Sequence, residues 1–241
     1  MAYGDFVLQK DLNFVVRRGS IFIIMGGSGC GKSTLLRHLI GLKQPALGSV
    51  HYNGVDFWQS AQQTRNTIMA NCGILYQSGA LWSSMTLSEN IGLPLKQHTD
   101  LDHGTIAELA SLKLNLVGLG GFEDFYPSQI SGGMRKRAGL ARAMALDPEI
   151  LFFDEPSAGL DPVSAKLLDD LIIELRDSLD TTIIMVTHEL ASIFAIGDDA
   201  IFLDNEKRTM IDQGNPHTLL KDSKEPKVKQ FLTRDGSQSR S

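Results

Sequence analysis

The segment GGSGCGKS at residues 26–33 constrains the fold of this chain more than any other stretch of its sequence. It has the spacing G-x-x-x-x-G-K-[ST], and it stands between an apolar, β-branched run at 20–26 and a run of helical periodicity at 33–42. A strand, a glycine-rich turn and a helix start together present backbone N–H groups and a partial positive charge to phosphate oxygens. The pattern therefore predicts a phosphate-binding loop, with Lys32 reaching the β- and γ-phosphates and Ser33 binding Mg²⁺. A chance glycine-rich turn is the alternative, and the strand–loop–helix context reduces it to roughly one in twenty.

Two further apolar runs, EILFFDEP at 149–156 and TTIIMVTHE at 181–189, predict buried strands. Between them, residues 161–179 have helical periodicity, and their apolar side chains are expected on one face. That face consists of Val163, Leu167, Leu168, Leu171, Ile172, Leu175 and Leu179. Strands that alternate with helices predict an α/β fold with a mostly parallel sheet covered on both faces.

The stretch at 84–146 lacks strand signals and is predicted to be helical. We interpret it as a helical subdomain inserted into the α/β core. The core is then discontinuous and consists of residues 1–83 and 147–232. The last residues, 233–241, are polar and are predicted to be disordered.

The composition narrows the class of protein. A net charge of −5 argues against general nucleic-acid binding, because such proteins are basic overall or on one face. Two cysteines provide no disulfide framework and fit a reducing compartment. The apolar runs are far shorter than the roughly 20 residues that a membrane-spanning helix needs. Any role at a membrane is therefore expected to depend on a partner protein.

Polar side chains stand where the predicted strands end. Away from a phosphate-binding loop, a solvated turn before Pro156 would be the better explanation of Asp154 and Glu155. Beside such a loop, they suit a metal ligand followed by a residue that orients water. His188 ends the run at 181–189. A lone histidine is usually a structural residue, but a position at the end of a core strand on the phosphate side favours a functional role. Gln77 ends a short apolar run, where a glutamine is normally only a polar strand terminus. Asp161 precedes a proline and is predicted to be a helix N-cap, a role compatible with a function.

These features occur in the order phosphate-binding loop, Gln77, ISGGM at 130–134, LFFDEP, SAGLD and His188. In this order they resemble the nucleotide-binding subunits of ABC transporters, and the resemblance extends over about residues 3–232. It implies a P-loop NTPase (RecA-like) core with the inserted helical subdomain. It also implies ATP and Mg²⁺ as ligands and hydrolysis of ATP to ADP and phosphate.

The resemblance implies a role for each matching residue. Glu155 would be the catalytic carboxylate, His188 the switch histidine and Gln77 the residue that senses the γ-phosphate and the membrane partner. Ser33, Gln77 and Asp154 would be the metal ligands. The implied nucleotide-binding residues are Tyr3 (stacked on adenine), Gly26, Gly27, Ser28, Gly29, Cys30, Gly31, Lys32, Ser33, Thr34, the signature residues Ser131, Gly132 and Gly133, and the D-loop residue Asp161.

In the family, two subunits close head to tail over two ATP molecules, so the resemblance implies a homodimer. Each signature segment, here residues 131–133, would contact the γ-phosphate held by the other subunit. A serine hydroxyl and bare glycine backbone can approach an oxyanion closely, and the positive end of the following helix points at it. Three basic residues follow at 135–137, and we expect most of them on a solvated face or in charge pairs between subunits. Contact with nucleic acid is not expected.

Met134 replaces the glutamine that commonly ends the signature. With this change, the segments at 75–95 and 134–143 and the closing KVKQFL at 227–232 are similar to Mla-type ATPases. That similarity implies a subunit held peripherally at the cytoplasmic face of a Gram-negative inner membrane by integral membrane permease subunits. MCE-domain proteins and small accessory subunits are further implied partners, and phospholipid moved between inner and outer membranes is the implied cargo.

The start of the chain departs from the family, in which a strand precedes the adenine aromatic. Here only Met1 and Ala2 precede Tyr3. We therefore expect either a shortened start or a sheet without that edge strand, with Tyr3 held less firmly.

Three other functions are weighed against this one. An ABC ATPase for lipoprotein release, cell division or small-solute import would have the same fold, and its co-purifying membrane partners would identify it. An ABC protein acting on DNA or ribosomes would need long coiled-coil inserts or two tandem cassettes, and this chain has neither. A P-loop kinase is disfavoured by the signature segment and by the lack of an evident acceptor site.

Overall fold

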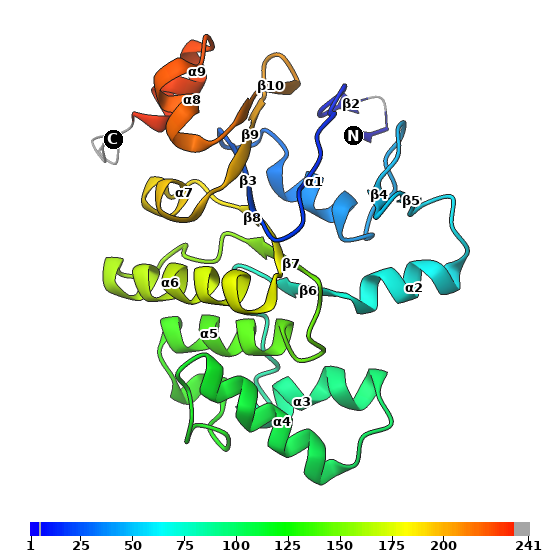
Figure 1. Cartoon of the computed structure of the whole chain (residues 1–241), viewed down its shortest axis with the longest axis vertical. Coiled ribbons are helices and arrows are strands. Elements are labelled where there is room, and N and C mark those ends of the chain that lie inside the picture. The colour runs from blue at the N-terminus through cyan, green and yellow to red at the C-terminus, as the bar shows by residue number, and fades with distance from the viewer. Residues whose placement is uncertain (5, 234–241) are drawn as a thin grey trace.

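The computed structural model describes residues 1–4 and 6–233 of the chain. A six-stranded sheet runs through it in the order β10-β9-β3-β8-β7-β6 (Figure 1). Its strands are β3 (Ile21–Gly26), β6 (Cys72–Leu75), β7 (Ile150–Asp154), β8 (Thr182–Val186), β9 (Asp199–Asp204) and β10 (Thr209–Gly214). Neighbouring strands from β9 to β6 pair in parallel, and β10 pairs with β9 in the antiparallel direction. The prediction of an α/β fold with a mostly parallel sheet is therefore confirmed.

Helices pack on both faces of the sheet and extend beyond its β6 edge (Figure 1). They are α1 (Lys32–Leu39), α2 (Gln62–Ala70), α3 (Leu87–His98), α4 (His103–Leu116), the 3₁₀ turn η1 (Pro127–Gln129), α5 (Gly132–Ala143), α6 (Pro162–Leu179), α7 (Leu190–Ile196), α8 (Pro216–Asp222) and α9 (Pro226–Leu232). Two short antiparallel pairs stand apart from the sheet: β1 (Ala2–Tyr3) with β2 (Phe6–Val7), and β4 (His51–Tyr52) with β5 (Val55–Asp56). Of the tail predicted to be disordered, residues 234–241 lie outside the described residues.

The central strands are buried on both faces. In β3, Ile21, Ile23 and Met25 belong to one apolar cluster, whereas Phe22 and Ile24 belong to a second cluster that includes the buried side chains of α1. Successive side chains of a strand point to opposite faces, so a strand covered by helices on both sides must be apolar throughout. This burial explains why the strands appear in the sequence as continuous apolar runs.

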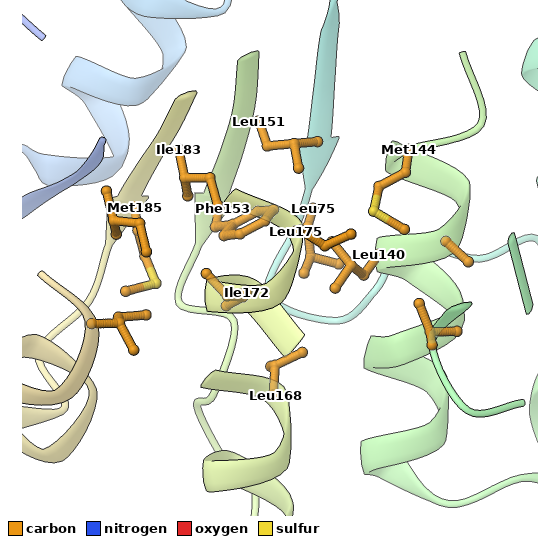
Figure 2. Packing of buried hydrophobic residues seen from close by; sticks show 14 of the residues in the cluster. Leu75, Leu140, Met144, Leu151, Phe153, Leu168, Ile172, Leu175, Ile183 and Met185 are labelled. Carbon is orange, nitrogen blue, oxygen red and sulfur yellow. The ribbon is translucent and has the colours of Figure 1, made fainter. Parts of the chain in front are cut away.

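Helix α6 covers one face of the sheet with a narrower stripe than the sequence predicts. Figure 2 shows Ile172 and Leu175 of α6 near Phe153 of β7, with Leu168 farther along the helix, and all four are buried. Three members of the predicted apolar face are instead exposed: Val163, Leu167 and Leu179. At about 100° per residue the predicted set spread over roughly half the helix circumference, and contact with a sheet covers only part of that.

Residues 84–146 contain helices and no strand. α3, α4 and α5 pack against one another, and α5 also contacts β6 and α6, which attaches this helical layer to the edge of the sheet. The chain enters α3 through a capping box, in which the Thr86 hydroxyl accepts from Glu89 N and the Glu89 carboxylate accepts from Thr86 N. None of the helices in the described part of the chain is both long and apolar enough to cross a membrane. The boundaries of the helical subdomain stay a prediction.

Candidate active site

The loops that follow three central strands leave the sheet at the same edge. Ile24 of β3 lies opposite Val186 of β8, and Val186 lies opposite Asp154 of β7. Since these strands are parallel, the segments after Gly26, Asp154 and Val186 become neighbours, although they are far apart in the sequence. The candidate site is built on this edge.

The glycine-rich loop depends on glycine at two positions, one for a close backbone contact and one for a left-handed conformation. A Cβ atom at Gly26 would lie 2.4 Å from the carbonyl oxygen of Leu203 in β9, so only glycine fits there. Gly31 caps α1 with a φ of 101°, a left-handed conformation that glycine adopts without a steric cost. The ammonium of Lys32 lies across the loop, where it donates to the carbonyl oxygens of Gly26 (2.9 Å) and Gly27 (3.0 Å).

The crest of the loop is open. Gly27, Ser28 and Gly29 are exposed, and an added Cβ at Gly27 or Gly29 would meet no atom within 4 Å. Thr34 follows Ser33 in the first turn of α1 and is partly buried. Exposed backbone without side-chain bulk at a helix start is the arrangement that admits a phosphate group.

The buried side chain of Gln9 holds the glycine-rich loop in place, a role that the sequence analysis missed. Gln9 is fully buried, and its amide donates to the carbonyl oxygens of Cys30 (2.8 Å) and Asp204 (2.9 Å). It thereby ties the loop to the end of β9. Burial also raises the pKa of the Cys30 thiol, since the charge of nearby Lys32 offsets only part of the desolvation. A single glutamine in a coil segment carries no sequence signal for such a role.

The first polar contact across the site joins α1 to β7. Ser33 Oγ donates to Asp154 Oδ1 at 3.3 Å, between residues that are 121 positions apart. A hydroxyl and a carboxylate at this separation offer oxygen ligands of the kind that Mg²⁺ prefers. The tertiary structure therefore brings together Ser33 and Asp154, two of the three residues that the resemblance implied as metal ligands.

Glu155 directly follows β7 in a left-handed backbone conformation, with a φ of 50°. Such a φ costs a non-glycine residue about 1–3 kcal/mol, and contacts around the residue must hold it. Its backbone N–H donates to Val186 O at 2.8 Å. Its side chain is 14% exposed and accepts a hydrogen bond from His188 Nδ1 at 2.9 Å. The pair therefore sits at the rim of the site, with the histidine toward solvent.

His188 was predicted to end the third strand, and this boundary was wrong. β8 ends at Val186, so His188 lies two residues beyond it, after the buried Thr187. From this position beyond β8, the imidazole lies within hydrogen-bond distance of Glu155, which follows the adjacent strand β7.

The signature segment begins a helix, as predicted. Ser131 is the N-cap of α5, and its Oγ accepts a hydrogen bond from Met134 N at 3.2 Å. Gly132 and Gly133 form the first helical positions and are partly exposed. α5 packs against α3, α4, α6 and β6, whereas α1 packs against β3, β7 and β8. The signature segment and the glycine-rich loop therefore belong to different layers of this chain (Figure 1).

The basic residues that follow the signature do not form the expected solvated face. Lys136 is only 7% exposed, and its ammonium donates to Ala158 O at 2.6 Å and to Glu155 O at 3.4 Å. Arg137 donates to the carbonyl oxygen of Val117 at 2.8 Å. Even Arg135, which is exposed, donates to the preceding backbone at Ile130 O. These cations bind carbonyl groups of their own chain, so the expectation was wrong for Lys136 and Arg137.

Three predicted residues lie around this centre. Asp161 is the N-cap of α6 and accepts hydrogen bonds from the backbone of Val163 and Ser164, which confirms its predicted structural role. Gln77 is exposed and follows β6, the strand beside β7. Tyr3 belongs to β1, and its side chain lies outside the described part of the structure.

The loop after Gln77 is held by an arginine that the sequence analysis did not single out. Arg142 donates to the carbonyl oxygens of Ala80 (2.6 Å) and Gly79 (3.3 Å), and burial lowers the pKa of its guanidinium. Both loop residues have a positive φ, of 49° and 77°. The same helix α5 thus holds the loop after Gln77 and the loop after Glu155.

Comparisons with known proteins identify the family and the fold. The family model described as ABC transporter matches residues 9–158. The "probable ribonucleotide transport ATP-binding protein mkl" of Mycobacterium tuberculosis is 40% identical over 231 residues, which are 96% of this chain and 64% of that protein. This chain therefore spans less than two thirds of the length of that relative. The "intermembrane phospholipid transport system ATP-binding protein MlaF" of Haemophilus influenzae is 38% identical, over 95% of this chain and 86% of that protein.

A solved structure shares the fold. It is the dimeric, post-hydrolysis state of the ATP-binding cassette MJ0796 bound to ADP and Pi, with a TM-score of 0.78 and 26% identity. The match covers 86% of this chain and 90% of that one. The resemblance drawn from the motifs, including the similarity to Mla-type ATPases, is therefore confirmed.

Proposed function

Because this chain belongs to the ABC transporter family, we propose that it is the ATP-hydrolysing subunit of a machine that transports phospholipid between membranes. The observation that carries the proposal is the convergence of Lys32, Ser33, Asp154, Glu155 and His188 at one edge of the sheet. There, Ser33 contacts Asp154 and His188 contacts Glu155, and Lys32 lies in the loop that directly precedes Ser33.

The residues at this edge fit Mg²⁺ and ATP. Open backbone at the crest of the loop, the start of α1 and the Lys32 ammonium suit a polyphosphate. Ser33 Oγ and the Asp154 carboxylate would hold Mg²⁺, with Gln77 as a further ligand. The described residues contain no cluster of three or more histidine, cysteine, aspartate or glutamate side chains, and Mg²⁺ characteristically binds one or two protein oxygens plus substrate phosphates. Such an ion would supply charge neutralisation at the phosphates.

In the proposed reaction, Glu155 orients the attacking water and accepts its proton. The oxygen of water bonds to the γ-phosphorus, the bond from that phosphorus to the β–γ bridging oxygen breaks, and ADP leaves with phosphate. His188 donates from Nδ1 to the Glu155 carboxylate and so fixes its orientation. Lys32 balances the negative charge of the phosphates. We also assign adenine stacking to Tyr3, sensing of the γ-phosphate to Gln77 and a place in the nucleotide site to Asp161.

We propose that Ser131, Gly132 and Gly133 act on the ATP held by a second copy of the chain. The location of α5 in a different layer from α1 supports this, and so does the dimeric state of MJ0796. Two inactive variants test it. Lys32→Ala breaks the loop and leaves the signature, whereas Ser131→Arg blocks the signature and leaves the loop. A mixed dimer then contains one complete site only if the signature acts across the dimer.

Mixing the two variants should therefore restore part of the ATP hydrolysis and ATP occlusion, although each homodimer is inactive. The measurement is phosphate release together with retained labelled ATP, after mixed dimers have been isolated through two affinity tags. Mixed dimers that neither hydrolyse nor occlude ATP would rule out the arrangement in trans.

The partners we propose are integral membrane permease subunits at the cytoplasmic face of the inner membrane, with MCE-domain and small accessory subunits. A cleft of about 620 Å³ between α2, α3 and α5 supports this, because it lies beside the loop after Gln77 and is lined by Met69, Tyr76, Gln97 and Arg142. We propose that a segment of a permease occupies this cleft. The core at 1–83 and 147–232 would then bind nucleotide, and the helical subdomain at 84–146 would transmit closure.

The cargo requires its own test, since one relative is named for phospholipid and another for ribonucleotide transport. The tagged chain should be purified with its membrane subunits in detergent, and its co-purifying subunits and lipids should be identified by mass spectrometry. Recovery of permease and MCE-domain subunits with bound phospholipid is expected. Recovery of a different class of membrane partner, without phospholipid, would refute the lipid assignment while leaving the ATPase assignment in place.

A further inference from the structure

A buried ammonium lies behind the proposed catalytic carboxylate. Lys136 stands one turn into α5 and is 7% exposed, and its Nζ donates to the carbonyl oxygens of Ala158 and Glu155. Desolvation lowers the pKa of this ammonium, and the negative charge of Glu155 opposes the shift. A buried cation is stable only where its donors find acceptors, so these two carbonyl groups account for its position.

The two acceptors are the ends of a single turn. Ala158 N donates to Glu155 O at 3.2 Å, and Lys136 reaches the carbonyl groups at both ends of this turn. Glu155 N is bound on its other side to Val186 O of β8. The left-handed backbone of Glu155 is thus held by β8 at its N–H and by α5 at its carbonyl. This backbone determines where the Glu155 carboxylate can point.

We propose that Lys136 is a positioning residue for the hydrolysis reaction: its ammonium holds the Glu155–Ala158 turn in the conformation that aims the Glu155 carboxylate. The inference rests on the proposed role of Glu155 in ATP hydrolysis. Helix α5, which carries the signature segment, would then also contribute a residue to the nucleotide site of its own chain. A neutral side chain of similar length would fill the space but would leave the turn free to relax from its strained φ.

The next residue provides a matched control. Arg137 is also partly buried, and burial lowers the pKa of its guanidinium as well. It binds the carbonyl oxygens of Val117 and Gly118, which follow α4 and lie in the helical subdomain. Lys136→Met and Arg137→Met therefore each remove one cation and its carbonyl contacts from α5, but only the first touches the Glu155 turn.

The test uses the full chain in complex with its co-purified membrane subunits. For Lys136→Met we expect kcat for ATP hydrolysis to fall at least tenfold, while KM and the dissociation constant for ATP stay within twofold. For Arg137→Met we expect kcat within twofold of wild type. An unchanged kcat in Lys136→Met would overturn the proposal, and so would an equal loss in Arg137→Met, because a general disturbance of α5 would then explain both.

A second comparison separates positioning from structural damage. In the background of Glu155→Gln, single-turnover cleavage of ATP should fall less than twofold when Lys136→Met is added, since the group that Lys136 positions is already absent. A tenfold further loss in that background would overturn the proposal. If Lys136→Met does not fold, Lys136→Gln replaces it in both comparisons. The glutamine side chain is one bond shorter than that of lysine, so its amide nitrogen cannot reach both carbonyl groups.

The proposed function and the role of Lys136 are refuted by different results. If the wild-type complex does not hydrolyse ATP, or if Lys32→Ala hydrolyses it as fast as wild type, both proposals are refuted. If the wild-type complex hydrolyses ATP, and Lys32→Ala loses this activity whereas Lys136→Met keeps it, only the role of Lys136 is refuted.

Discussion

Replacing Glu155 by glutamine removes the proposed proton-accepting group and leaves the contacts that hold the residue in place. The backbone contacts of Glu155 to Val186 and Lys136 are independent of the side chain, and the glutamine amide keeps an oxygen that can accept from His188. The side chain is 14% exposed, so an isosteric amide fits the same space. Only the negative charge and the base are lost.

We expect Glu155→Gln to lower the rate of ATP hydrolysis by about 10²–10⁴, the range typical of a general base. At about 1.4 kcal/mol for each factor of ten, this raises the activation barrier by roughly 3–5.5 kcal/mol. ATP binding should be retained, since Lys32 and Ser33 are untouched, and the variant should accumulate as an ATP-bound dimer. The assays are single-turnover cleavage of labelled ATP, equilibrium binding of a fluorescent ATP analogue, and size-exclusion chromatography with and without Mg–ATP.

The neighbouring carboxylate provides the control. Glu189 lies 3.7 Å from His188 Nε2, on the opposite side of the imidazole from Glu155. Glu189→Gln removes the same charge from the same histidine, and we expect it to hydrolyse ATP within threefold of wild type. Hydrolysis by Glu155→Gln at a rate within threefold of wild type would refute the reasoning, because the base would then have to be another group.

Three predictions concern stability. Ile172 of α6 is fully buried against β7, so Ile172→Ala should lower the free energy of unfolding by about 2–5 kcal/mol in urea denaturation. Leu167 on the same helix is exposed, so Leu167→Ala should change that free energy by less than about 0.5 kcal/mol. Asp161→Ala should cost about 1 kcal/mol by the same measurement through loss of the α6 N-cap, and an unchanged midpoint would contradict the cap. Asp169 accepts a hydrogen bond from Ser192, and burial raises the pKa of its carboxyl group. The folded state therefore binds this proton more tightly than the unfolded chain does. The free energy of unfolding falls as the pH rises from about 4 toward the pKa of Asp169 in the folded state. Asp169→Asn should remove this loss, so the stability of wild type relative to Asp169→Asn should decline as the pH rises above about 4. A difference that stays constant with pH would contradict the prediction.

The sequence by itself determined the local pieces of this protein. The glycine-rich loop between a strand and a helix, the central apolar strands and the N-cap at Asp161 each follow from local rules about backbone conformation and side-chain burial. The helix at the signature segment follows from the same rules, since Ser131 can satisfy a free N–H at its start. These pieces, with their order, were enough to indicate the fold class and the family.

Only the tertiary structure decided how the pieces meet. The sequence analysis did not predict β9 and β10, and it missed Gln9, whose amide joins the loop to a residue 195 positions away. It also expected most of the cations at 135–137 on a solvated face or in charge pairs between subunits, because consecutive cations at a helix start give no indication of the carbonyl groups that a distant turn supplies to Lys136. Contacts between residues far apart in the chain depend on the order of the strands in the sheet, which the sequence analysis did not predict. For the same reason, the hydrogen bonds from Ser33 to Asp154 and from His188 to Glu155 appear only once the parallel sheet places their loops at one edge.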